Sequence, residues 1–409
     1  MINQFVDSMP NKFIYTTILK NQICSAILLF SSFSCVALLS AEPVIGSKID
    51  VNIDGAVINA GVEAGGDTTT TQTIGNLDAG HILNDSVSVS LPSAINVSAT
   101  IAGDAESEQN IGVIRGNNAT NDSVTVTAKD TIINAGITVA GYGKTLQNVG
   151  VIGSDSGSVE NSSISVTANS LVNASVGVAA DLGGTEQNVG VITAKSGSIS
   201  NAKETVDVST ALNIAAGIAA DASANQDIAT IDGANINDSS NQVTANKVIN
   251  VSAALAASSS ANQLVGVIKG GNVENIKSEI NVGSLVNASA GLAADVDATQ
   301  NIGLINAGDK SLEDDSLTVT AKSITNISAA VIGKSSAEQD IGTITGSVKN
   351  SLMKIDIDGN LSNVAATLAG SATSVQNIGS IDVGRAKSVN VLLKAKSISG
   401  VSASLLGAA

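Results

Sequence analysis

A short segment built on glutamine, asparagine and glycine recurs along the chain and decides the fold. It reads QNIGVI at 109–114, QNVGVI at 147–152 and again at 187–192, QNIGLI at 300–305 and QNIGSI at 376–381. The glutamine that opens it recurs at intervals of 37 to 40 residues, and no linker divides the array. A fixed period of this length is the signature of a repeat architecture in which each unit stacks on its neighbours.

Each unit contains two further segments that begin at an asparagine. In the unit that starts at Gln109 they begin at Asn121 (NDSVTV) and Asn134 (NAGITV). Apolar and polar residues alternate after each asparagine, which is typical of a short strand, and Asn, Gly, Ser and Asp suit the corners. Three strands per 37–40-residue unit predict an all-β fold, a parallel β-solenoid of about nine stacked coils. An antiparallel β-sandwich or a meander is the structural alternative.

In a solenoid the repeated amides stack on their own copies. We expect them to form hydrogen-bonded ladders along the axis, because an in-register ladder satisfies amides that would otherwise be buried without partners. The predicted ladder positions are Gln72, Gln109, Gln147, Gln187, Gln226, Gln263, Gln300, Gln339 and Gln376; Asn84, Asn121, Asn161, Asn201, Asn237 and Asn275; and Asn96, Asn134, Asn173, Asn213, Asn250, Asn287, Asn326 and Asn363.

The first 41 residues differ from the array. Lys12 and Lys20 precede an apolar run at 23–39, and small residues follow at 40–41, which is the pattern of a secretory signal peptide. An uncleaved membrane anchor is the alternative. We therefore expect a signal peptide at 1–41, an N-terminal partial repeat at 42–71 and a nine-repeat solenoid domain at 72–409. The mature chain would have no membrane span and would be extracellular or at the cell surface.

Composition excludes several other classes of protein. Hydrophobic residues make up 43% of the 409 residues, which is too apolar for a disordered chain, yet aromatic residues make up only 1%. All four Phe and both Cys lie within the first 35 residues, so the array must build its core from Val, Ile, Leu and Ala. Without residues 1–41 the net charge is −17, which disfavours nucleic acid and anionic lipid as partners.

The array offers little for catalysis. His81 is the only histidine and no repeat copies it, and no phosphate-binding or nucleophile motif occurs. We therefore expect no enzymatic activity, no cofactor and no metal site. Asp104, Asp181, Asp221 and Asp295 recur after the third strand, and such carboxylates could hold calcium. A polar corner is the simpler interpretation.

The third strand of each unit is made almost entirely of small or aliphatic residues. Examples are IAAGIAA at 214–220 and ASAGLAA at 288–294. Short helices are an alternative, because Ala favours helix, but the alternating pattern favours strands. A face of small side chains can approach another flat surface closely, which suggests lateral contact between rods.

This organisation resembles the secreted repeat amyloids of the curli and Fap kind, through the Gln-opened repeats, the inner asparagines and a unit length closer to Fap than to curli. The resemblance implies one stacked layer per repeat and self-association end to end, with other fibre subunits and a secretion apparatus as further partners. The N-x-G-x-I coils are also similar to those of filamentous-haemagglutinin-like adhesins. We expect a secreted structural protein that polymerises into fibres of a biofilm matrix or a cell-surface filament. The alternative is a monomeric repeat adhesin or surface-layer component that binds a host or cell-surface ligand.

Overall fold

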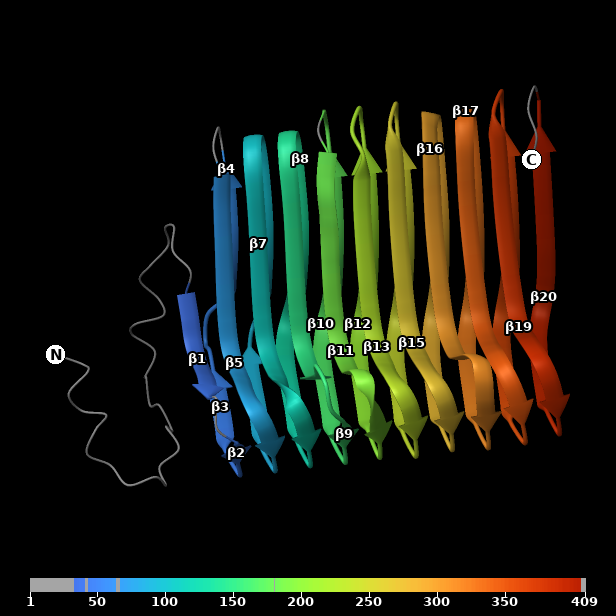
Figure 1. Ribbon diagram of the computed structural model, residues 1–409. Coiled ribbons are helices and arrows are strands. Elements are labelled where there is room, and N and C mark those ends of the chain that lie inside the picture. The colour runs from blue at the N-terminus through green and yellow to red at the C-terminus, as the bar shows by residue number, and fades with distance from the viewer. Residues whose placement is uncertain (1–32, 41–42, 64–66, 180, 406–409) are drawn as a thin grey trace, which may run out of the picture.

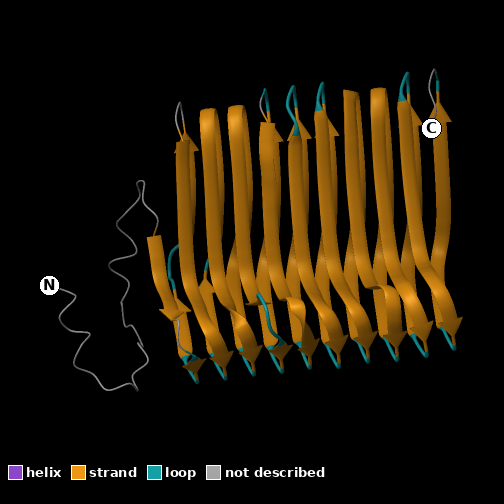
Figure 2. Ribbon diagram, in the orientation of Figure 1, coloured by secondary structure: helices purple, strands orange, loops and turns teal. Residues whose placement is uncertain are grey.

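The structure is a computed structural model of the chain and describes residues 33–40, 43–63, 67–179 and 181–405. Throughout these ranges the regular elements are strands, without a helix among them (Figure 2). The strands are β1 (Phe33–Ser40), β2 (Val44–Ile45), β3 (Lys48–Asn52), β4 (Val57–Glu63), β5 (Asp67–Leu83), β6 (Ser86–Leu91), β7 (Ala94–Thr120), β8 (Ser123–Ser154), β9 (Val159–Glu160), β10 (Ser163–Gly177), β11 (Asp181–Ser200), β12 (Lys203–Gly217), β13 (Ala222–Asn237), β14 (Ser240–Ala254), β15 (Ser258–Glu274), β16 (Lys277–Glu313), β17 (Ser316–Lys349), β18 (Leu352–Thr367), β19 (Ser371–Lys387) and β20 (Asn390–Ser404).

The strands form a parallel β-solenoid. Away from the two ends of the rod, each strand pairs with its equivalents one repeat before and one repeat after it, as β10 pairs in parallel with β8 and with β12. The register places Gln147 beside Gln187 and Asn173 beside Asn213. Figure 1 shows the result as a single row of similar arcs from the N-terminal to the C-terminal end. At about 4.8 Å per coil, nine coils make a rod about 45 Å long. The predicted fold class is confirmed, and the parallel pairing is incompatible with an antiparallel sandwich.

The strands are longer than three short segments per repeat, because backbone pairing continues through most corners. β16 contains 37 residues and β8 contains 32. The corner that interrupts pairing in coil after coil has a residue in the left-handed region, such as Asn121 (φ 56°) or Asn161 (φ 49°). Asparagine tolerates this conformation better than most residues with a side chain. This backbone requirement explains the middle asparagine of most repeats; Asp238, Asp314 and Ser388 adopt the same conformation in the others.

Each coil encloses two interiors of different width. In the wide part the walls pack around large aliphatic side chains such as Ile164, Leu171 and Ile192. In the narrow part, which we call the arm (residues 95–109 and their equivalents), the chain folds back on itself, and Ser98 Oγ donates to Ala105 O at 2.9 Å. The buried side chains of the arm are mostly Ala, Ser, Thr, Asn and Gln. Small side chains allow its two layers to lie close together.

The glycine of the QNIGVI segment fits a corner where a side chain would not. Gly150 has φ +62°, and a Cβ built on it would lie 2.6 Å from Val166 Cγ2. We expect Gly150→Ala to destabilise the fold by about 2–3 kcal/mol, because alanine adds left-handed strain and a clash. Chemical denaturation measures the loss. Ala229 already adopts φ 55° at the equivalent corner. Ala229→Gly should therefore be neutral or mildly stabilising, and equal losses in the two variants would contradict this account.

Candidate functional site

The nine glutamines form one continuous ladder along the rod. From Gln109 onward each Nε2 donates to the Oε1 of the preceding glutamine, as Gln109 does to Gln72, at distances of 2.5–2.7 Å. The side chains from Gln109 to Gln339 are fully buried. Several also donate across the arm, as Gln147 Nε2 does to Ile133 O at 3.0 Å. The ladder therefore joins neighbouring coils and also the two layers of the arm.

The third asparagine of each unit forms a second ladder of opposite direction. Its Nδ2 donates to the following asparagine, from Asn59 through Asn96 to Asn363, at 2.9–3.2 Å. The same Nδ2 atoms also bond the facing backbone, as Asn213 Nδ2 does to Ala224 O at 2.9 Å. Gly400 occupies the equivalent position in the last coil, beside Asn363. The ladder consequently ends at Asn363.

The middle asparagines are arranged differently. Asn84 and Asn121 lie on the exposed corner and form one pair at 2.9 Å, and Asn201 and Asn161 form another at 3.0 Å. Asn237 does not belong to this column, contrary to the sequence-based assignment, because the left-handed corner residue of that coil is the following one, Asp238. Asn275 Nδ2 donates to Asp238 Oδ1. This column contains separate exposed pairs and not a buried ladder.

The structure also contains amide and carboxyl positions that the sequence analysis did not single out. Asn110, Asn148 and Asn188 form a short stack at 2.8 and 3.0 Å, and the QN dipeptide was the available signal. Asp122 is buried just after the left-handed corner, and its Oδ1 accepts from the Asp85 backbone N at 2.9 Å. Burial raises the pKa of Asp122 to about 7, and the pKa of the equivalent Asp315 to about 7.

One buried carboxyl has no partner at all among the described residues. Glu204 is fully buried in the wide part of its coil, and neither carboxylate oxygen forms a hydrogen bond there. The equivalent residues of the two preceding coils are Val124 and Ile164, and those of the two following coils are Asn241 and Ser278. Burial raises the pKa of Glu204 well above its ordinary value.

The last coil has an open end. β19 pairs only with β17 and β20 only with β18, so the other edge of each is unpaired in the described chain. Ile398 occupies the same inward column as Ile324 and Leu361, which are 0% and 1% exposed, but it is 73% exposed itself. Val391 and Leu393 of this coil are also exposed. This end therefore presents apolar side chains and an unpaired strand edge. It lies at the C-terminal side of the row in Figure 1.

The other end begins inside the predicted signal segment. β1 lies next to the edge of β5, with Phe33 beside Gln72 and Ser40 beside Ala79. β3 and β4 pair with β6 and β7, so that residues 48–63 stack as a coil on the first complete repeat. Removal of residues 1–41 would therefore leave the β5 edge unpaired from Gln72 to Ala79.

The residues considered for catalysis or metal binding do not converge. The His81 ring lies on an exposed corner, with its Nδ1 3.0 Å from Asn118 Nδ2. Asp221 Oδ1 accepts from the Ser258 backbone N at 3.1 Å, and the register sets Tyr142 between Asp104 and Asp181. Among the described residues no three His, Cys, Asp or Glu side chains are grouped as metal ligands would be. The same residues include no helix with the length and apolar character of a membrane span.

No protein-family model, no curated protein and no solved structure matches this chain.

Proposed function

We propose that the protein is a secreted structural subunit whose rods join end to end into extracellular filaments, as in a biofilm matrix or a cell-surface fibre. The open last coil is the observation that carries this proposal. Solenoids that stay monomeric cover their ends with a polar cap. Within the described residues Ile398 is 73% exposed, in a column that is buried in the two preceding coils. A second rod stacked there would bury this column as an internal coil does.

The direction of the Gln ladder makes the two ends complementary. In the last coil Gln376 Nε2 donates to Gln339, and no described residue donates to Gln376 Oε1. In the first rung Gln72 Oε1 accepts from Gln109, and its Nε2 has one long bond, 3.4 Å, to Ile58 O. A head-to-tail joint would place a donor opposite an acceptor. Such a contact uses two different surfaces, so it does not close and generates a filament.

Acid should promote this assembly. Without residues 1–41 the net charge of −17 opposes the approach of two rods, and protonation or salt reduces that repulsion. Asp122 and Asp315, whose pKa values are about 7, also become neutral on acidification, because burial favours the protonated carboxyl. Their protonation lowers the negative charge further. Secretion rests on the signal-peptide pattern of residues 1–41.

Electron microscopy and light scattering of the purified protein test the proposal. We expect filaments to grow faster at pH 4.5 than at pH 8, and added salt to reduce the difference. Ile398→Lys, which places a charge in the open end, should abolish filaments. Thr373→Lys adds the same charge to the exposed outer surface of the last coil and should leave them intact. Discrete short rods under every condition, or filaments unchanged by Ile398→Lys, would refute end-to-end stacking and favour a monomeric adhesin or surface-layer component.

A further inference from the structure

One outer face of the arm is apolar along the whole rod. It consists of the outward residues of the third strand, the four alternating positions that in one coil are Ile95, Val97, Ala99 and Ile101. The parallel register repeats these four positions in nine coils, and in the last coil they are residues 399, 401, 403 and 405. Every residue at them is Val, Ile, Leu or Ala except Thr325, Ser362 and Ser399. We call this surface the apolar face.

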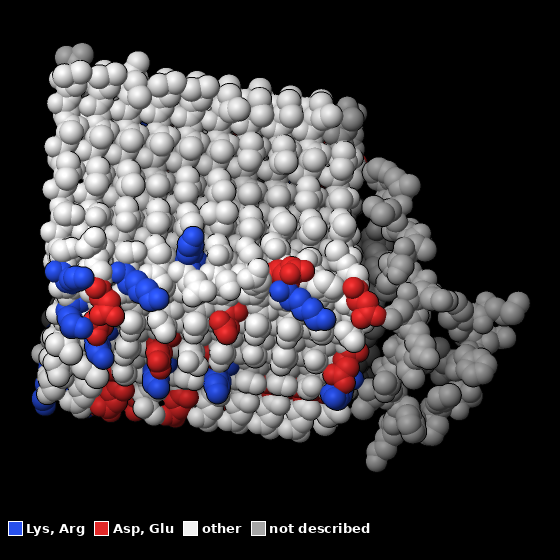
Figure 3. Space-filling model, turned by 180° about the vertical axis from the view of Figure 1, so that it is seen from behind, with Lys and Arg blue, Asp and Glu red and all other residues white. Residues whose placement is uncertain are grey.

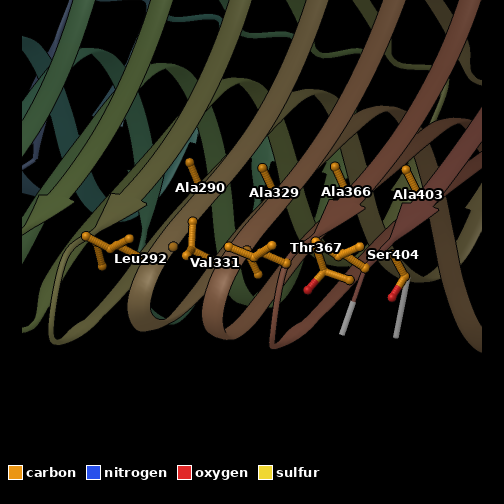
Figure 4. A pocket seen from close by; sticks show the side chains of 13 residues that line it. Ala290, Leu292, Ala329, Val331, Ala366, Thr367, Ala403 and Ser404 are labelled. Carbon is orange, nitrogen blue, oxygen red and sulfur yellow. The ribbon is translucent and has the colours of Figure 1, made fainter. Parts of the chain in front are cut away.

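The apolar face has a ridge and a groove that run parallel to the rod. The ridge has one Ile, Val or Leu per coil, from Ile101 to Leu405, and these include Leu255, Leu292 and Leu368, each 44% exposed. Beside it, the neighbouring column is alanine in six consecutive coils, from 216 to 403. Four of these alanines, 290, 329, 366 and 403, lie in a row along a groove of about 680 Å³ (Figure 4).

Charge divides the surface of the molecule sharply. In the view of Figure 3, the upper half of the rod is free of charged residues across the coils, and the lower half carries both signs. The other outer face of the same arm is acidic, with Asp104, Glu106, Glu108, Asp295 and Asp297 turned outward. One outer face of the arm is therefore charged and hydrated, whereas the opposite face has no charged residue.

The apolar face is large for a monomer. With a strand rise of about 3.4 Å and a coil spacing of about 4.8 Å, four columns in nine coils cover roughly 900 Å². The largest apolar patch on a typical monomer is about 300–600 Å². Two such faces in contact would bury roughly 1,800 Å², which lies within the range of a specific, stable protein interface.

We propose that the apolar face pairs with the same face of a second copy of this chain. Only a partner with an equally long, flat and uncharged surface covers nine coils at once, and a second rod has that surface with the same coil spacing. A ridge of aliphatic side chains on one copy can lie in the alanine groove of the other, which gives the dry contact typical of paired sheets. The net charge does not oppose this contact locally, because the acidic faces point away from each other.

The experiment separates lateral pairing from end-to-end stacking by blocking the ends first. All proteins carry Ile398→Lys, and sedimentation velocity measures their association. We expect the end-blocked protein to form dimers. Ala253 lies in the groove column at the middle of the nine coils, so it faces the centre of the partner in either rod direction. Ala253→Glu should weaken the dimer at least about 100-fold, because it buries an unpaired charge.

Two controls make the result specific. Ser260→Glu adds the same charge to the acidic face of the same arm, close along the chain, and should leave the dimer intact. An equimolar mixture of Ala253→Glu and Ala253→Lys proteins should recover dimers, which a merely misfolded variant could not do. An end-blocked protein that stays monomeric at all concentrations overturns lateral pairing, whether or not the unblocked protein forms filaments. Flotation of that monomer with neutral phosphatidylcholine vesicles, lost in Ala253→Glu, would instead assign the face to a lipid surface.

Discussion

Replacing Glu204 with isoleucine should stabilise the protein by about 2–4 kcal/mol at pH 8, an unusual gain for one substitution. The carboxyl is fully buried and has no hydrogen-bond partner among the described residues. Keeping it in the core costs free energy in either protonation state. Isoleucine is already present at the equivalent position of the preceding coil, as Ile164, where the wide part accommodates it. Urea denaturation of the variant and the parent at pH 8 measures the difference.

The sign of the pH dependence follows from the raised pKa of Glu204. Between the ordinary pKa of glutamic acid and the raised value, the unfolded chain is ionised while the folded chain keeps its proton. Stability is therefore highest in acid and falls as the pH rises through this window. Asp122 and Asp315, with pKa values of about 7, add to the same trend. Glu204→Ile should retain the part that these aspartates and two others contribute, because burial also raises the pKa of Asp227 to about 6 and the pKa of Asp85.

Glu204→Gln distinguishes the effect of ionisation on stability from the effect of burying a polar group. It should flatten the pH dependence as isoleucine does, because it cannot ionise. It should gain less stability at pH 8, because a buried amide without partners still carries a desolvation cost. If all three proteins unfold at the same urea concentration at pH 8, Glu204 must be hydrated or paired in solution and this account of its burial is wrong.

The fold could be predicted from the repeat because each coil of a solenoid contacts only the coils before and after it in the sequence. A period of 37–40 residues, fixed Gln and Asn positions and alternating strands suffice to align each coil on the next. The two interiors could not be predicted in the same way, since the sequence shows small residues on the third strand but not which layer they face. The hydrogen bond from Ser98 Oγ to Ala105 O shows that these residues face the returning half of the arm.

The ladders show a second limit of the sequence. An amide side chain recurs in each of the three columns, but its burial differs between them. Asn213 is fully buried, whereas Asn201 lies on an exposed corner. Asn237 was misassigned because the chain reaches the left-handed corner one residue later there, at Asp238, and an aspartate can adopt the same φ. The inward position of Glu204 could have been found by aligning the repeats, which places it after Val124 and Ile164.

The contrast between buried and exposed asparagines predicts a large difference in stability. Asn213→Ala should destabilise the protein by about 3–5 kcal/mol. The Asn213 Nδ2 donates to Asn250 Oδ1 at 2.9 Å and to two backbone carbonyls, those of Ala224 and Asn262, at 2.9 and 2.8 Å. Its Oδ1 accepts from Asn173 Nδ2 at 2.9 Å. Alanine would remove all of these bonds. Asn250 Oδ1 would lose its amide donor in an interior too tight to supply another, whereas Asn173 Nδ2 would keep its bond to Asn225 O at 2.7 Å.

The matched control is Asn201→Gly in the same coil. Asn201 also bonds an asparagine of the preceding coil, Asn161 at 3.0 Å, but water can replace that bond on the exposed corner. Glycine keeps the left-handed φ of 50° at this position without strain. We expect a change within about 0.5 kcal/mol in denaturant unfolding, against the loss of several kcal/mol for Asn213→Ala. Comparable losses would mean that burial does not determine how much these amides contribute, and the buried ladder would then not be what holds coil to coil.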